Sequence, residues 1–181
     1  MCKQSTTIAR LASKDSTKAI GFPKTAYNFI SALPAGKLHR GEIEYSIDSQ
    51  NHLQLAMAAF NNHIFYAWWR VWGDAFHLTN YLIESMPIPD LWLEDQQIKT
   101  EAQHIGKQLE QFLDNSDNIT QNRTGTKSKE FENINYHDTA SALIEQADKL
   151  YFKALNITGK EAESTLIELH KMRSNSNWKY D

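Results

Sequence analysis

The chain of 181 residues has one cysteine, no long apolar run and a polar N-terminus, and each of these shortages excludes a class of protein. The single cysteine, Cys2, cannot form an internal disulfide, which is typical of a reducing cytoplasm and also argues against a zinc site. No stretch approaches the roughly 18 apolar residues of a membrane helix. The first residues lack the apolar segment of a secretory signal. We therefore expect a cytoplasmic protein without membrane association.

Common catalytic motifs are also missing. A phosphate-binding P-loop ends in Gly-Lys-Ser/Thr, and no such tripeptide is present. A restriction-nuclease centre of the PD-(D/E)xK type needs a carboxylate two residues before a lysine to bind Mg²⁺, and no lysine has one. We find no nucleophile paired with a base. An enzyme with an unfamiliar site is therefore the least favoured interpretation, although a pocket with mutually perturbed His and Asp residues would favour it.

Charge is spread unevenly along the chain, although the net charge is only -3. Residues 1–40 carry seven Lys and Arg side chains against the single acid Asp15, and the remainder is acidic. Such a chain could turn a basic face toward phosphate while an acidic face stays solvated. Chance unevenness of surface charge is the alternative. A DNA-binding domain is often more basic than this chain, whose pI is about 6.2.

Apolar periodicity predicts an α+β fold, with a small antiparallel sheet or hairpin, a buried aromatic helix and a mainly helical C-terminal half. Alternating residues suit strands, and apolar residues at i, i+3, i+4 spacing suit helices. The predicted elements are strands over 26–30 and 42–47, a turn over 34–37, one central helix over 52–72 with Gly73 as its C-cap, and helices over 93–113, 138–155 and from 158 onward.

The densest aromatic cluster lies between Phe60 and Pro89 and holds three of the five tryptophans. It runs as an aromatic helix, a turn and a proline exit, with the sequences FYAWWR (65–70), GDAFHLT (73–79) and MPIP (86–89). This order resembles the C-terminal target-recognition region of type II adenine-N6 DNA methyltransferases, including those fused to an endonuclease. In that family "(S/G)D-x-x-H-(L/I)-(N/T)" follows a helix with stacked aromatics, and "(F/M)-P-(I/V)-P" comes next.

A second stretch, Ala147 to Glu161, is similar to the C-terminal pattern "I-D-x-x-V-x-x-L-Y-G-L-T-x-x-E" of the same family, with its Tyr-Gly replaced. The pattern along the chain and the resemblance together give a domain plan with four parts. These are a flexible N-terminal segment over 1–18, a target-recognition core over 19–113, a polar loop over 114–137 and a C-terminal helical extension over 138–181.

The resemblance also implies a non-catalytic function. The chain would be a DNA target-recognition (specificity) domain that binds double-stranded DNA beside a catalytic methyltransferase domain or subunit. The family holds its target adenine with (Asn/Asp/Ser)-Pro-Pro-(Tyr/Phe/Trp) and binds S-adenosylmethionine with closely spaced glycines. None of the four prolines here is followed by another, and the seven glycines are isolated. We therefore expect no cofactor in this chain, with S-adenosylmethionine and Mg²⁺ confined to the missing catalytic domains.

The candidate DNA contacts are cationic or amide side chains on predicted strands, turns and loops. They are Lys24, Lys37, His39, Arg40, Arg70, His77, Asn80, Arg123 and Lys127.

Several of these candidates have structural alternatives. His77 could donate to a phosphate or base edge, or tie the turn through a backbone carbonyl, and Asp74 would cap turn amides. Arg70 could bind phosphate or a buried carboxylate. Asn80 could bind adenine or act as an N-cap. The cations of the polar loop could simply be solvated.

The tryptophans at 68, 69 and 72 could stack on an extruded base, but their helical spacing favours the core. The alternative function is a helical protein–protein interaction module without a nucleic-acid role. The acidic C-terminal half and the amphipathic helices over 138–155 and 158–172 would suit it. An exposed apolar patch would favour this module, whereas a basic cleft would favour DNA.

Overall fold

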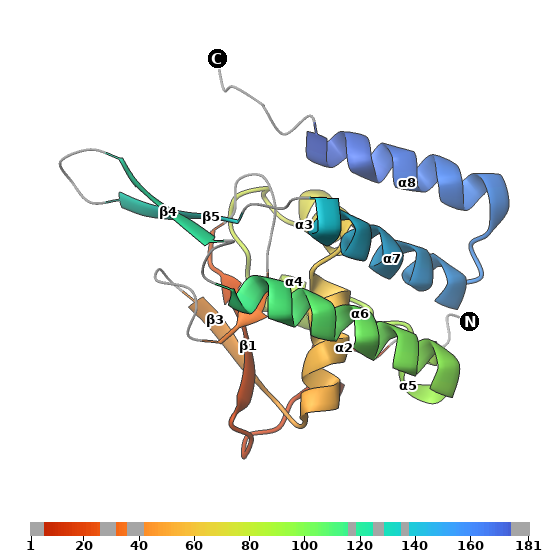
Figure 1. Cartoon of the computed structure of the whole chain (residues 1–181), viewed down its shortest axis with the longest axis horizontal. Coiled ribbons are helices and arrows are strands. Elements are labelled where there is room, and N and C mark those ends of the chain that lie inside the picture. The colour runs from red at the N-terminus through yellow and green to blue at the C-terminus, as the bar shows by residue number, and fades with distance from the viewer. Residues whose placement is uncertain are drawn as a thin grey trace.

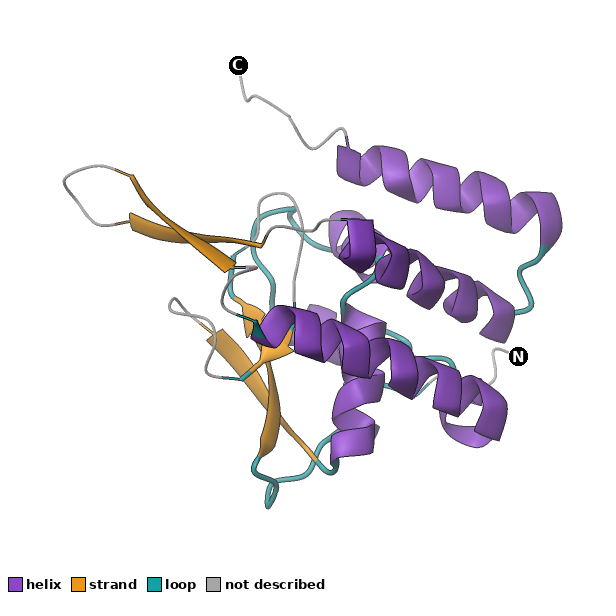
Figure 2. Cartoon of the chain, viewed as in Figure 1, coloured by secondary structure: helices purple, strands orange, loops and turns teal. Residues whose placement is uncertain are grey.

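The computed structural model of the chain describes residues 6–25, 32–35, 42–115, 119–124, 129–134 and 138–174. Its elements, in chain order, are α1 (Ile8–Leu11), β1 (Lys18–Pro23), β2 (Leu33–Pro34), β3 (Glu42–Ile47), α2 (Gln50–Phe60), α3 (His63–Trp72), α4 (Asn80–Ser85), α5 (Leu91–Glu94), α6 (Gln96–Asp114), β4 (Ile119–Thr124), β5 (Lys129–Ile134), α7 (Asp138–Ala154) and α8 (Gly159–Ser174). Helices form most of the structure, and the strands gather at one side (Figures 1 and 2). The predicted α+β class is confirmed.

The main sheet is antiparallel with strand order β2-β1-β3. The predicted strand over 42–47 is confirmed as β3, and its alternate residues Ile43, Tyr45 and Ile47 pack in or against the core. The strand predicted over 26–30 lies outside the described residues, and the partner of β3 is β1 instead. We did not predict β1 from the sequence, because Gly21 and Pro23 are typical strand breakers. Ile20 and Phe22 on one face of β1 are nevertheless fully buried. Pro34, predicted in a turn, pairs with Ile20.

The first part of the chain was predicted to be flexible over 1–18, and the structure contradicts this from residue 6 onward. Ile8 and Leu11 of α1 are fully buried in the core. The backbone is also anchored on both sides, since Ile88 donates a hydrogen bond to the carbonyl of Thr6 and Asp48 donates one to the carbonyl of Leu11. Two apolar residues within a polar segment were enough to dock it.

The predicted central helix over 52–72 is wrong in one respect, because it is two helices, α2 and α3. The break falls at Asn61, whose side chain donates to the carbonyls of Met57 and Ala32 and accepts from the N–H of Ala32. Asn61 therefore satisfies a backbone carbonyl that the end of α2 leaves open and ties the helix to the segment before β2.

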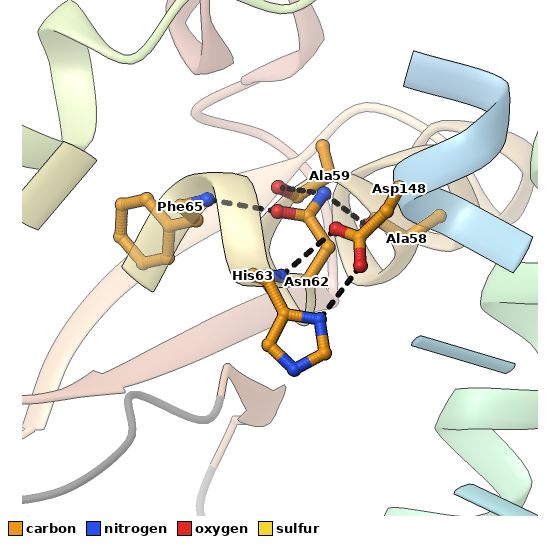
Figure 3. A network of polar contacts seen from close by, with 6 residues as sticks. All are labelled: Ala58, Ala59, Asn62, His63, Phe65 and Asp148. Atoms are coloured by element: carbon orange, nitrogen blue, oxygen red, sulfur yellow. Dashed lines mark hydrogen bonds and ion pairs between the residues drawn. The ribbon is translucent and has the colours of Figure 1, made fainter. Parts of the chain in front are cut away.

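Asn62 begins the second helix. Its side-chain oxygen accepts from the N–H of Phe65, and its side-chain nitrogen donates to the carbonyls of Ala58 and Ala59 (Figure 3). One amide thus caps the C-terminus of α2 and the N-terminus of α3 together. Gly73 is the C-cap of α3, as predicted, and its N–H donates to the carbonyl of Trp69.

Helix α6 crosses α2 closely, and α7 packs on α6 (Figure 1). The close approach depends on Gly106, because a Cβ there would lie 1.7 Å from the backbone oxygen of Gln54. The helices predicted over 93–113, 138–155 and from 158 are confirmed as α6, α7 and α8. In the part of the chain that the structure describes, no helix is both long and apolar enough to cross a bilayer.

The predicted polar loop over 114–137 is wrong, because it contains an antiparallel hairpin of β4 and β5. The pairs run from Ile119 opposite Ile134 to Thr124 opposite Lys129. Backbone hydrogen bonds hold such a ladder whatever the polarity of its side chains. The polar composition therefore concealed the strands, which extend away from the helices in Figure 1.

Candidate functional site

The turn that follows α3 is built around Asp74. One carboxylate oxygen accepts from the N–H groups of Phe76 and His77, at 2.9 and 2.6 Å, and the other lies 2.6 Å from Nδ1 of His77. The hydrogen bond from the His77 ring, followed by the two backbone bonds, lowers the pKa of Asp74 to about 2. The predicted capping role of Asp74 is confirmed. His77 ties the turn through this carboxylate and not through the backbone carbonyl that we expected.

This turn lies against the end of β1. The N–H of Leu78 donates to the carbonyl of Lys24 at 2.9 Å, and Thr25 forms an isolated antiparallel bridge with His77. The structure therefore brings together two predicted DNA contacts, Lys24 and His77, which are far apart in sequence. Both side chains are exposed. An exposed cation and an exposed imidazole are suitable ligands for phosphate oxygens.

The aromatic residues of α3 divide between core and surface. Trp69 is fully buried, and its indole N–H donates to the carbonyl of His77. Trp68 is half-buried, and its indole N–H donates to the carbonyl of Leu82 at 3.2 Å. Trp72 is 65% exposed, so its predicted place in the core is wrong. It lies in the last turn of α3 on the side that faces solvent, whereas Trp69 in the same turn faces the core.

Arg70 and Asn80, two further candidate DNA contacts, are also described by the structure. The guanidinium of Arg70 lies 5.9 Å from the centroid of the Trp69 ring, which is a cation–π contact. Asn80 is not an N-cap, because that role belongs to Thr79, whose hydroxyl accepts from the N–H of Leu82. Asn80 is instead the exposed first residue of α4.

Lys37, His39, Arg40 and Lys127 lie outside the described residues, and Arg123 falls in β4, where only the backbone is described.

A second His–Asp pair, which sequence analysis missed, lies in the core. Nδ1 of His63 is 2.6 Å from one oxygen of Asp148, and the backbone N–H of His63 donates to the other at 3.0 Å (Figure 3). Both side chains are buried, with 1% and 0% exposed. The carboxylate thus binds the first residue of α3, where the helix dipole favours negative charge, and joins α3 to α7. The only sequence signal was Asp148 itself, a charged residue beside Ala147 in the apolar stripe of α7.

Both of these His–Asp pairs are therefore engaged in holding backbone, one in an exposed turn and one at a buried helix N-terminus. Among the described side chains, no three His, Cys, Asp or Glu residues gather as metal ligands would. No family model, curated protein or solved structure matches this chain.

Proposed function

We propose that this chain is the DNA target-recognition part of a type II restriction–modification adenine-N6 methyltransferase and has no catalytic activity of its own. The observation that carries the proposal is the exposed turn over 73–79, which has the family's Asp-x-x-His order and lies beside Lys24. His77 in this turn and Lys24 after β1 are both exposed and can donate to phosphate.

The geometry gives the Asp-x-x-His spacing a physical reason. An aspartate three residues before a histidine can accept the amides at i+2 and i+3 and still meet the ring at i+3, as Asp74 does with Phe76 and His77. The Asp-x-x-His order therefore suits a turn that exposes a histidine while one of its ring nitrogens is hydrogen-bonded to the aspartate.

The two stretches that resemble the family also meet in space, which supports treating them as parts of one pattern. His63 belongs to the first stretch and Asp148 to the second, and they form the buried pair. In the second stretch, Asn156 has φ +58° and stands where the family has Tyr-Gly. After glycine, asparagine is the residue best suited to this left-handed conformation.

In the proposed complex, the chain binds duplex DNA next to a catalytic domain or subunit in the cytoplasm. That partner would supply S-adenosylmethionine and Mg²⁺. Phosphate contacts from Lys24 and His77 would set the register of the chain on the DNA, and side chains in a groove would select the sequence.

Fluorescence anisotropy with a labelled random-sequence duplex, at several salt concentrations, tests this proposal. We expect affinity to fall steeply with salt, because each phosphate contact releases condensed counterions. Lys24→Ala should reduce the slope of log affinity against log salt by about one unit. The matched control Lys107→Ala removes an exposed lysine from α6 and should leave the slope unchanged. Absence of binding at low salt would contradict the proposal.

A protein-interaction module is the second candidate, because the same region carries exposed apolar side chains. Val71, Trp72 and Tyr81 are 67%, 65% and 73% exposed. Exposed aromatic residues that gather within a short segment are typical of protein interfaces. Sedimentation of the chain without DNA tests this candidate, which predicts self-association that Trp72→Ala abolishes.

A further inference from the structure

The hairpin of β4 and β5 stands apart from the helical core. Its two strands of 6 residues each pair with each other along their whole length, and they extend away from the helices (Figure 1). Within the described ranges, neither strand makes an extensive contact with another helix or strand. A two-stranded hairpin on its own is only marginally stable in water, so it gains stability from whatever it binds.

The register of this ladder divides the residues of the hairpin between two faces. Successive residues of a strand belong to opposite faces, and residues directly opposite each other on paired strands share a face. One face, which we call the acidic face, comprises Ile119, Gln121, Arg123, Glu130, Glu132 and Ile134. The other, which we call the amide face, comprises Thr120, Asn122, Thr124, Lys129, Phe131 and Asn133. Both glutamates of the two strands therefore fall on one face, and the amide face has no acid.

The residue types of the amide face match the major-groove edges of A·T base pairs. Asparagine can form two hydrogen bonds with adenine, at N6 and N7, whereas phenylalanine and the methyl group of threonine make apolar contacts with the thymine methyl. Asn122 lies opposite Phe131 in the ladder, and Asn133 lies opposite Thr120. Each of these two pairs combines a residue type suited to adenine with one suited to thymine.

The acidic face is less suited to DNA. Arginine is the commonest reader of guanine, but Arg123 lies opposite Glu130 and shares its face with Glu132. Carboxylates on this face would oppose the phosphates that line a groove. On the amide face, in contrast, Lys129 is the charged residue and can bind phosphate.

A ribbon of two strands also has the dimensions of the major groove. Paired strands lie about 5 Å apart, and the major groove of B-DNA is about 12 Å wide, so the groove admits a two-stranded ribbon. Positions two residues apart on a strand are separated by about 7 Å, which is close to the length of two base-pair steps. The pair of Asn122 with Phe131 and the pair of Asn133 with Thr120 are spaced in this way. They therefore suit two base pairs of one short site.

We propose that the hairpin of β4 and β5 is the base-reading element of this chain, and that its amide face enters the major groove and recognises two A·T pairs. Asn122 and Asn133 read the adenines, and Lys129 binds a phosphate at the edge of the groove. The proposal rests on the proposed DNA-binding function and adds to it the place of base readout and the base composition of the target.

The test begins with selection of bound duplexes from a random pool, and the motif enriched by the wild-type chain should contain at least two A·T pairs. In fluorescence anisotropy with this motif, Asn122→Ala should weaken binding about tenfold, the size expected for one lost bidentate contact. A selection with Asn122→Ala should leave one of the A·T positions unspecified, and one with Asn133→Ala the other.

The matched control is Gln121→Ala, because Gln121 is the neighbour of Asn122 in the sequence but belongs to the acidic face. This variant should keep both the affinity and the motif of the wild-type chain. Circular dichroism should show the same helix content in all three variants, since the hairpin lies outside the helical core.

A second readout addresses the thymine methyl groups directly. Uracil in place of thymine removes only this methyl group, so the wild-type chain should bind the uracil-substituted motif less tightly. Phe131→Ala should bind the two forms of the motif equally at the position that Phe131 contacts.

A motif without A·T pairs, asparagine variants that retain the wild-type motif, or equal effects of Gln121→Ala and Asn122→Ala would overturn readout by the amide face. These outcomes would leave the DNA-binding function standing. A wild-type chain that binds no DNA, or that binds DNA without enriching a motif, would overturn both.

Discussion

Asp148→Ala is the substitution that most directly tests how this fold is held together. The carboxylate of Asp148 accepts from the backbone N–H of His63 and lies 2.6 Å from its ring nitrogen, in a fully buried setting. Alanine at this position removes the acceptor of both groups. Water cannot replace it without opening the contact between α3 and α7.

The expected loss is about 3–5 kcal/mol of unfolding free energy, because a buried N–H and a buried ring nitrogen both lose the carboxylate that they contact. A domain of this kind has a total stability of about 5–15 kcal/mol, so the loss is a large share of it. Asp148→Asn keeps an oxygen that can accept from the N–H of His63, and it should lose only about 1–2 kcal/mol.

Urea denaturation followed by circular dichroism gives these quantities. With a urea slope of about 2 kcal/mol per molar, the midpoint of Asp148→Ala should fall by roughly 2 M. The neighbouring exposed residue provides the control, and Lys149→Ala should change stability by less than about 0.5 kcal/mol. In a double-mutant cycle with His63→Ala, the two losses should not add. A loss below about 1 kcal/mol for Asp148→Ala, or full additivity, would refute the reasoning.

Three further outcomes are expected. Asn156→Gly should raise stability by about 0.5–1 kcal/mol in the same urea assay, because Asn156 has φ +58° after the end of α7 and glycine carries no steric penalty there; a lower midpoint would contradict this. Gly106→Ala should lower stability by about 2 kcal/mol, since its Cβ would meet the backbone oxygen of Gln54 at 1.7 Å and the helix-propensity gain is only about 1 kcal/mol; unchanged stability would contradict it. NMR titration should give Asp74 a pKa of about 2, and this pKa should return toward 3.8 in His77→Ala. Because folding lowers this pKa, the stabilisation from the contact is complete above about pH 4 and is lost as pH falls through about 2. An ordinary pKa of Asp74 in the wild-type chain would contradict the turn geometry.

Elements with a single clear period could be predicted from the sequence. Strand β3 alternates apolar and polar residues over its whole length, and α6 carries one apolar stripe, so both were located within a few residues. The break between α2 and α3 could not be predicted in this way. The apolar period continues across it, and only the side-chain hydrogen bonds of Asn61 and Asn62 reveal it.

Those contacts of the candidate site that join residues close together in the sequence could be predicted. The contacts of Asp74 span three residues, so a turn motif was enough to predict its capping role. Contacts between distant parts of the chain were not predictable from one sequence. The pair of His63 with Asp148 joins residues 85 positions apart, and the placement of Lys24 beside the turn depends on where β1 ends. The exposure of Trp72 likewise depends on which side of the last turn of α3 the rest of the chain covers.

Selection of bound DNA from a random duplex pool, followed by sequencing, tests the central claim most directly. Sequence recognition predicts that one short motif becomes enriched over successive rounds and that binding to this motif falls less steeply with salt than binding to the unselected pool. A pool that shows no enriched motif, or a chain that retains no DNA at low salt, would contradict the claim that this protein recognises a DNA target.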